Sequence, residues 1–372
     1  MNVPSTLSEL KTQRLRASFY AQDALVAFML GAQIFIDGTG RAPRHALSAI
    51  YLCALSAPVC AVLLAALIRR LRLRHEMQSL PAICRSVLGP VAGSCVCLLM
   101  GVLFLCDALG ALAMLSALGN ARLFPLHQST VIFPSALLVL FIAVTCAGVG
   151  LARLAYLSRR FIPFLLLLLS VLLVYREPLS NLFPLLGRSI PMSVQSALSA
   201  TGAASCALAT GFLPAGIQSS GPDLPRPRLK PLWIGGLISC ALLLCVALSM
   251  PASALARGVH WSELLVHAGA LTANGRFRYL LVVLTECFAL LIALGGSIYF
   301  AVCALSHVVS IRLSRAVVFL LCAAAAAVLY LAGNAFVFAL LPLRFVPALL
   351  LVAAVMAVDQ LRLRRQKRRH SL

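Results

Sequence analysis

Acidic residues are scarce in this sequence: only 10 of its 372 residues are Asp or Glu, and charged residues of both signs together make up 11% of the chain. A water-soluble domain of this length needs far more charge on its surface. Hydrophobic residues amount to 62%, and the mean hydropathy is +0.99. The composition therefore excludes a soluble protein and indicates a polytopic membrane protein.

Signature motifs of enzymes are missing as well. The chain has no P-loop, no GxSxG and no glycine-rich dinucleotide fingerprint, so we expect neither an enzyme nor a cofactor. Its 13 cysteines are scattered through apolar runs without any CxxC pair, which argues against a zinc or redox centre. His260, Glu263 and His267 share helical spacing but lack an HExxH motif, so we expect an interfacial helix there and no metal site.

Long apolar runs dominate what is present. A span needs about 20 apolar residues to cross the hydrocarbon core. Ten such runs occur, near 18–36, 46–68, 88–116, 129–148, 160–175, 193–216, 231–250, 279–304, 315–333 and 336–358. No polar linker divides them, so we expect one membrane domain over 1–372, ending in a basic tail at 360–372, with the first span retained rather than cleaved.

The basic residues, which give a formal net charge of +21, indicate the orientation. With a cytoplasmic N-terminus, 22 of the 31 Lys and Arg fall in inside segments and the other nine in outside segments. This bias follows the positive-inside rule and predicts both termini in the cytoplasm, with the protein in the cytoplasmic membrane. Membrane lipids, rather than nucleic acid, are the expected partners of the basic runs 69–75 and 362–370.

Five spans followed by five spans predict an inverted-topology repeat. The second set, about 193–359, then enters the membrane from the side opposite to the first set, about 18–176, and span 1 corresponds to span 6. Such folds bind their ligand near the bilayer midplane, at interrupted helices in corresponding positions. The predicted fold is therefore an all-α LeuT-like transporter fold with broken helices 1 and 6.

Small and polar residues stand at matching places in those two spans. Span 6 contains LSATGAASCALATGF (198–212), which includes Thr201, Gly202 and Ser205, and span 1 carries Gly31 and Gln33 past its centre. Glycines and hydroxyl groups can mark an unwound helix that offers backbone groups to a ligand. They can equally mark surfaces where helices pack closely, and the sequence leaves both interpretations open.

Two acids lie inside expected spans. Asp107 falls in 88–116 and Glu286 in 279–304. An ionised carboxylate there costs at least about 2.5–3.5 kcal/mol, so each should face the bundle interior, either as a proton- or amine-binding group or as a structural hydrogen-bond partner. Asp37, in IDGTG directly after span 1, is expected in a turn on the outer side, and Asp23 in the first turn of its helix.

The chain resembles the spore germination permease family, the B-type subunits of endospore germinant receptors, within the amino acid–polyamine–organocation transporter superfamily. The segments GVGLARLAYLSRRFIPF (148–164) and NLFPLLGR (181–188) are similar to family segments, and Gln22 stands where the family often has Gln. The Arg and Trp that often accompany the family's span-8 Glu are absent around Glu286. The resemblance implies a membrane subunit that senses a small nutrient and works with A-type and C-type receptor subunits in the spore inner membrane.

Three alternative functions follow, in order of preference. The first is a germinant receptor subunit that binds an amino-acid-like germinant through Gly31, Gln33, Thr201, Gly202 and Ser205. The second is a proton- or sodium-coupled amino acid transporter in which Asp107 or Glu286 is the coupling group. The third is a structural membrane subunit that binds no ligand.

Overall fold

The computed structural model describes residues 7–39, 52, 54–118, 149–159, 161, 190–214, 228–249, 273–308, 324, 327 and 340–370. These residues are almost entirely helical. The helices are α1 (Leu7–Thr39), α3 (Ser56–Arg74), α4 (Leu80–Leu88), α5 (Pro90–Leu118), α7 (Val149–Ser158), α9 (Ile190–Ala200), the 3₁₀ helix η4 (Thr201–Gly211), α10 (Lys230–Ser249), α13 (Ala273–Leu305), the short 3₁₀ helix η5 (Leu341–Arg344) and α15 (Phe345–His370).

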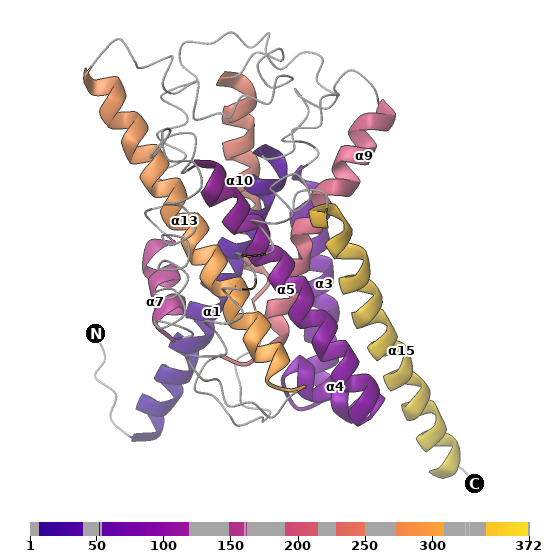
Figure 1. Ribbon diagram of the computed structural model, residues 1–372. Helices are drawn as coiled ribbons and strands as arrows, with labels where there is room; N and C mark the ends of the chain where they lie inside the picture. Colours follow the sequence, from indigo (N-terminus) through magenta and orange to yellow (C-terminus); the bar gives the residue numbers. More distant parts are fainter. Residues whose placement is uncertain are drawn as a thin grey trace.

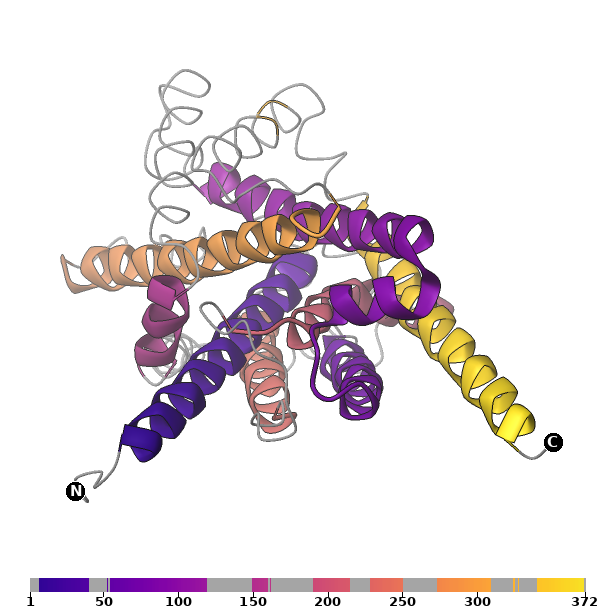
Figure 2. The same cartoon turned by 90° about the horizontal axis from the view of Figure 1, so that it is seen from below.

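The bundle is built around α1 and η4. α5 and α13 pack against each other along their length, and α1 lies between α13 on one side and α10 on the other (Figures 1 and 2). α3 packs against η4, which also contacts α1 and the α15 end of the chain. One large apolar core joins these elements, and it includes the ring cluster Phe104, Phe212 and Phe300, whose centroids lie 5.5–5.8 Å apart.

Most of the described helices coincide with predicted spans, whereas α4 and α7 lie between them. Runs 18–36, 46–68, 88–116, 193–216, 231–250, 279–304 and 336–358 fall on them, whereas 129–148, 160–175 and 315–333 lie wholly or largely outside the described residues. Among the described helices, the stretches Leu15–Asp37, Pro90–Leu115, Leu284–Leu305 and Leu341–Gln366 are long and apolar enough to cross a membrane. The protein is thus an integral membrane protein.

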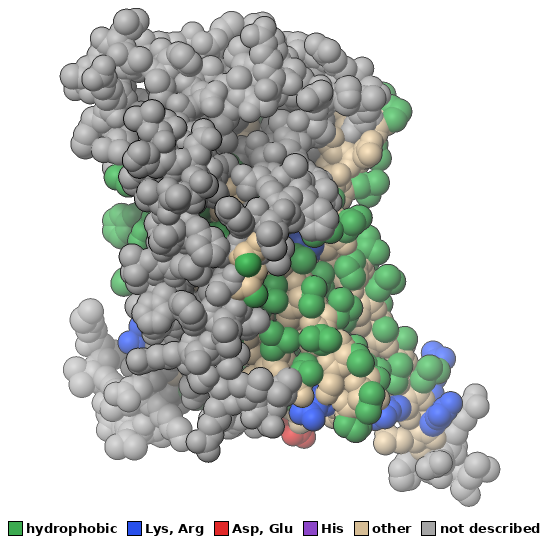
Figure 3. Space-filling view, viewed as in Figure 1, with side chains coloured by type: hydrophobic (Ala, Val, Ile, Leu, Met, Phe, Trp, Pro, Cys, Tyr) green, Lys and Arg blue, Asp and Glu red, His purple; other side chains and the backbone are tan. Residues whose placement is uncertain are grey.

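The surface of the bundle agrees with this assignment. Large apolar side chains point outward from α5 and α15, among them Leu98, Val102, Val346 and Leu350. Figure 3 shows such side chains over much of the visible described surface, with most of the visible Lys and Arg at one end. α1 begins and α15 ends at that same end (Figure 1), as an even number of spans requires. That this end faces the cytoplasm stays a prediction.

The first helix differs from the prediction, because α1 continues unbroken from Leu7 to Thr39. Gly31 does not interrupt it but packs against α10: a Cβ on Gly31 would lie 2.8 Å from Ser239 Oγ, and one on Gly235 would lie 2.8 Å from the carbonyl oxygen of Ala27. Small residues four apart on each helix thus allow close approach. Gly31 therefore lies at a close helix contact, and its predicted role in ligand binding stays a prediction. Asp23, expected in a first helical turn, lies well inside α1.

The second predicted interruption is present as a change of helix type. α9 ends at Ala200, and the chain continues as a 3₁₀ helix for 11 residues. Runs of 3₁₀ helix longer than three or four residues are uncommon and often mark a hinge or a strained segment. Hydroxyl groups of Thr201, Ser205 and Thr210 each donate to a carbonyl three residues earlier, at 2.6–2.9 Å. These bonds fit the three-residue turn and compete with the α-helical pattern.

Small side chains let η4 run through the interior, where all of its residues are buried. Its far end is held by two long side chains. Gln22 Nε2 donates to the carbonyls of Ala209 (3.3 Å) and Phe212 (2.9 Å), and Arg72 Nη1 donates to that of Thr210 (2.8 Å). Carbonyls left open where a helix ends need such partners when they are buried.

Candidate functional site

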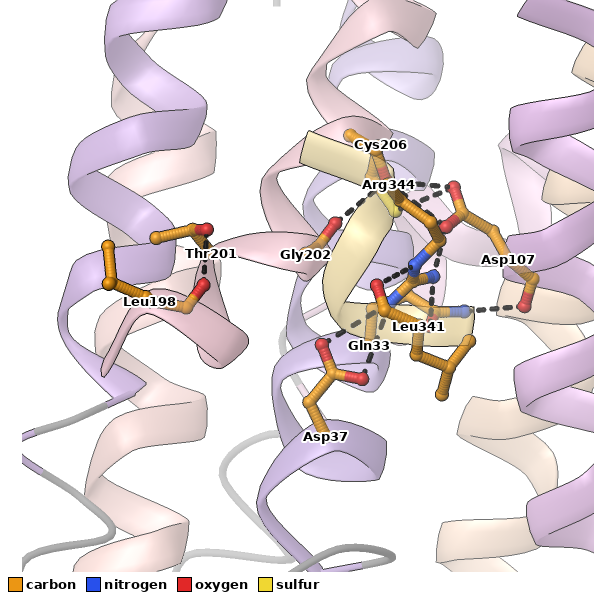
Figure 4. Close-up of polar contacts among 10 residues, drawn as sticks. Gln33, Asp37, Asp107, Leu198, Thr201, Gly202, Cys206, Leu341 and Arg344 are labelled. Atoms are coloured by element: carbon orange, nitrogen blue, oxygen red, sulfur yellow. Dashed lines mark hydrogen bonds and ion pairs between the residues drawn. The ribbon is translucent and has the colours of Figure 1, made fainter. Parts of the chain in front are cut away.

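A cluster of charged and polar side chains lies buried between α1, α5, η4 and η5 (Figure 4). Arg344, the last residue of η5, is at its centre with only 2% of its surface exposed. Gln33 and Asp37 reach Arg344 from one face of α1, and Asp107 reaches it from α5. Ser205 of η4 donates to Asp107. Residues that are far apart in the sequence therefore meet at one point of the fold.

The guanidinium group of Arg344 uses all three of its nitrogens. Nε donates to the carbonyl of Leu341 at 2.6 Å, Nη1 donates to Gln33 Oε1 at 2.9 Å and forms an ion pair with Asp107 Oδ1, and Nη2 lies 3.3 Å from both carboxylate oxygens of Asp37. Arginine presents its donors in a rigid planar fork, so these partners fix its orientation. Arg344 is thus shared between two carboxylates.

Asp107 has further partners. Ser205 Oγ donates to its carboxylate at 3.1 Å and Cys206 Sγ at 3.4 Å, both from η4. Gln33 Nε2 donates to the backbone carbonyl of Asp107 at 2.7 Å, so the same amide binds both Asp107 and Arg344. Asp107 is completely buried. A carboxylate in such a place is stable only with a cation and hydrogen-bond donors around it, and this cluster supplies both.

Glycines allow the four elements to approach closely. A Cβ on Gly202 would collide with the carbonyl oxygen of Leu341 and lie 3.0 Å from Pro342 Cα, and one on Gly110 would lie 2.9 Å from a methyl carbon of Leu341. The lack of a Cβ at these two positions therefore lets η5 pack directly against η4 and α5. The carbonyl of Gly202 also lies 2.9 Å from Ser205 Oγ and accepts a hydrogen bond from it, so Gly202 supports the cluster through its backbone.

The predicted site residues separate into two groups. The cluster contains Gln33, Ser205 and Asp107, with Gly202 at its edge. Thr201 donates to the carbonyl of Leu198, away from the cluster (Figure 4), and Gly31 packs against α10. Glu286 is buried on α13, and none of the described side chains of that helix belongs to this network.

The sequence-based predictions misplaced one member of the cluster, Asp37, and missed another, Arg344. Asp37, expected in an outer turn, belongs to α1 and binds Arg344. Arg344 was assigned to the outside segments by the count of basic residues, although it falls inside the expected span 336–358. A basic residue inside a span is a functional candidate by default, and that rule would have selected Arg344.

Metal binding has no support in the described part of the chain. Among those residues, no group of three or more His, Cys, Asp or Glu is placed to hold a metal ion. The segment with His260, Glu263 and His267 lies outside them. The charge that faces Asp107 is a resident guanidinium group.

Comparisons with known proteins assign the fold. No protein-family model matches the chain, and no curated protein is found as a relative. Among solved structures, two crystal structures of the Eremococcus coleocola manganese transporter match with a TM-score of 0.55. One is a mutant at 15% identity and the other a complex with an aromatic bis-isothiourea-substituted compound at 14%. Each match covers 96% of this chain and 79% of the other. The chain has the LeuT-like fold of these polytopic transporters.

Proposed function

We propose that the chain is the ligand-binding membrane subunit of a germinant receptor, with its site at the cluster around Asp107 and Arg344. The observation that carries the proposal is this buried ion pair, which joins the first predicted repeat to the second. Charged groups in the interior of a membrane protein are expensive and usually functional. Here they meet where η4, the one long 3₁₀ segment among the described residues, passes α1.

The cluster provides a physical route from binding to signalling. A ligand that takes either charged partner changes the contacts of η5 and α5 together, because Arg344 and Asp107 hold these elements to each other and to α1. Occupancy then shifts the population between two arrangements of the bundle, provided that the ligand binds one arrangement more tightly. Partner subunits read the shift.

The germinant role itself is supported by resemblance. It rests on the segments 148–164 and 181–188 and on Gln22, which in the structure binds the carbonyls at the far end of η4. The role brings with it the A-type and C-type receptor subunits as partners and the spore inner membrane as the location. It also assigns the end of the bundle that carries the basic tail to the cytoplasm.

Thermal stability of the purified protein in detergent tests the proposal. Amino acids, nucleosides and sugars are added one at a time, and we expect a saturable rise in melting temperature with one class of compound. The rise should disappear in Asp107→Asn and persist in Asp359→Asn. Asp359 is a buried acid of α15 outside the cluster, where it pairs with Arg74 and His75. No rise with any compound would favour the structural subunit that binds no ligand. Spores that carry Asp107→Asn should germinate poorly while the subunit remains abundant.

A coupled amino acid transporter is the second candidate. The likeness to solved structures of a transporter favours it, and so does the burial of Asp107, which a coupled proton could neutralise. Uptake of a labelled amino acid into proteoliposomes, driven by a pH or sodium gradient and lost in Asp107→Asn, would select this function over a receptor that moves no solute.

A further inference from the structure

α4, the start of α5 and the last turns of α15 meet in a corner at the end of the bundle where α15 ends (Figure 1). Arg85, in the last turn of α4, is exposed there. Arg362 of α15 is exposed as well, and its Nη1 donates to the carbonyl of Ser86 at 2.8 Å. This hydrogen bond holds the guanidinium group of Arg362 next to the end of α4. Two arginines from distant parts of the chain therefore share the corner.

Their charges are not balanced by an acid within the part of the chain that the structure describes. Neither Arg85 nor Arg362 forms an ion pair with any of its Asp or Glu residues. Asp359, one turn before Arg362, pairs instead with basic residues at the end of α3. His307, just after α13, is half-buried, and burial together with the positive charge of Arg85 lowers the pKa of its imidazole. The corner thus carries an excess of positive charge, which favours the binding of an anion.

An exposed apolar stripe of α5 begins at the same corner. The backbone at Gly93 lies so close to α4 that a Cβ there would be 2.6 Å from Arg85 Cα. From this contact onward α5 exposes Val91, Leu98 and Val102, at 77%, 48% and 45% of their surface. Their spacing of seven and then four residues places them on one face of the helix. Because α5 is long and apolar enough to cross a membrane, this stripe lies against lipid chains.

We propose that the corner binds one anionic phospholipid, with its headgroup between Arg85 and Arg362 and an acyl chain along the stripe of α5. A phospholipid combines what the two features require. Its phosphate accepts charge-assisted hydrogen bonds from arginine, and its chains match an apolar helix face. A soluble anion would use the arginines alone. The corner is separate from the cluster around Asp107, so the inference does not depend on the proposed function.

A site of this kind differs from a general attraction of basic residues to the membrane, because it depends on where the charges lie. Arg364 is exposed like Arg362, but residues two apart on an α-helix lie about 200° apart around its axis. Arg153 is exposed on α7, which lies on the other side of the bundle from α4 (Figures 1 and 2). Arg153→Gln with Arg364→Gln therefore removes the same charge as Arg85→Gln with Arg362→Gln, but away from the corner.

The test measures binding of phosphatidylglycerol to the purified protein in detergent, through the rise in melting temperature during a titration. Phosphatidylcholine with the same acyl chains carries no net charge, and inorganic phosphate has no chains. We expect phosphatidylglycerol to bind at least about 10-fold more tightly than phosphatidylcholine. Inorganic phosphate should give no saturable rise at the same concentrations. Arg85→Gln with Arg362→Gln should weaken phosphatidylglycerol binding by about 30-fold, because each arginine at an anionic headgroup contributes about 5-fold.

The control with Arg153→Gln and Arg364→Gln should change the dissociation constant by less than about 2-fold at physiological salt, since distant charges are screened. Equal weakening in the two double variants would show an attraction that depends only on net charge, and would overturn the inference. Phosphatidylcholine that binds as tightly as phosphatidylglycerol would also overturn it, as would the absence of any rise with phosphatidylglycerol. Inorganic phosphate that binds as tightly would identify a site for a soluble anion instead.

Loss of the fold does not obscure this result. All four substituted arginines are exposed, so we expect both double variants to remain folded. The preference for phosphatidylglycerol over phosphatidylcholine is also a ratio measured on one folded sample, and it does not depend on the yield of a variant. That ratio should fall in Arg85→Gln with Arg362→Gln and stay unchanged in the control.

Discussion

Replacement of Arg344 with methionine removes the cation of the cluster and keeps a side chain of similar length. Asp107 is then buried with Ser205 and Cys206 as donors and without a positive charge. Breaking a buried ion pair by removing one partner typically costs about 3–5 kcal/mol of folding free energy. Arg344→Met also deprives Gln33 Oε1 and the Leu341 carbonyl of their donor. We therefore expect a loss at the upper end of this range.

The double variant Asp107→Leu with Arg344→Met should be more stable than Arg344→Met alone. Replacing both partners of a buried pair with apolar groups is often neutral, because neither charge of the pair is left in the interior. Asp37 loses its ion pair with Arg344 in the single and in the double variant alike, so the difference between the two variants reports on Asp107. Ser205 keeps an acceptor in that variant, since its hydroxyl group also donates to the carbonyl of Gly202. We expect the second substitution to recover about 2 kcal/mol or more of the loss.

Reversible unfolding in SDS, followed by circular dichroism of the purified protein, measures these free energies. Arg362→Met is the control, since Arg362 is exposed and donates to the carbonyl of Ser86; its effect should stay within about 0.5 kcal/mol. Asp107→Leu is also measured alone. If the losses of Asp107→Leu and Arg344→Met simply add up to the loss of the double variant, Asp107 and Arg344 do not interact. The reasoning from the buried pair would then be refuted.

The other predictions concern packing and the ends of η4, and the same unfolding assay measures each of them. Gly202→Ala should cost about 1–3 kcal/mol because its Cβ would collide with the backbone of η5. Gly31→Ala should cost less than about 1 kcal/mol, because its Cβ is too close only to a serine hydroxyl group and is in ordinary contact with the carbonyl oxygen of Gly235. Equal effects at the two glycines would contradict the packing described here. Arg72→Met should cost at least about 2 kcal/mol, because three buried or half-buried carbonyls lose their donor. Its control is Arg70→Met, at an exposed position, which should change the free energy of unfolding by less than about 0.5 kcal/mol. Gln22→Leu should cost about 1–3 kcal/mol through the loss of two hydrogen bonds to the end of η4, and an unchanged stability would show that those carbonyls find other donors.

The helices could be predicted because the signal for a membrane span is strong and local. Apolar runs of sufficient length indicate α1, α5 and α13 without any knowledge of their neighbours. The backbone conformation at a glycine within such a run, in contrast, cannot be predicted from the neighbouring sequence. Gly31 lies two residues before Gln33, and Gly202 directly follows Thr201. Gly31 nevertheless packs in a continuous α-helix, whereas Gly202 lies in a 3₁₀ segment. Which of the two conformations forms depends on the helix that packs against the glycine.

The site was predicted in part for a similar reason. Gln33, Asp107 and Ser205 were identifiable because polar groups inside spans are costly. Asp37 escaped because Gly38 and Gly40 follow it and a turn was the simplest interpretation. Arg344 escaped because basic residues were counted only as markers of orientation. That Arg344 meets Asp107, 237 residues earlier in the chain, is a property of the packed bundle.

The most direct test of the central claim is the dissociation constant of the stabilising ligand, measured for the unmodified protein, Asp107→Asn and Asp359→Asn. The account predicts binding about 100-fold weaker or more in Asp107→Asn and unchanged in Asp359→Asn, because only Asp107 belongs to the cluster with Arg344. Equal dissociation constants in all three proteins would show that the ligand binds elsewhere and that the buried pair only holds the bundle together.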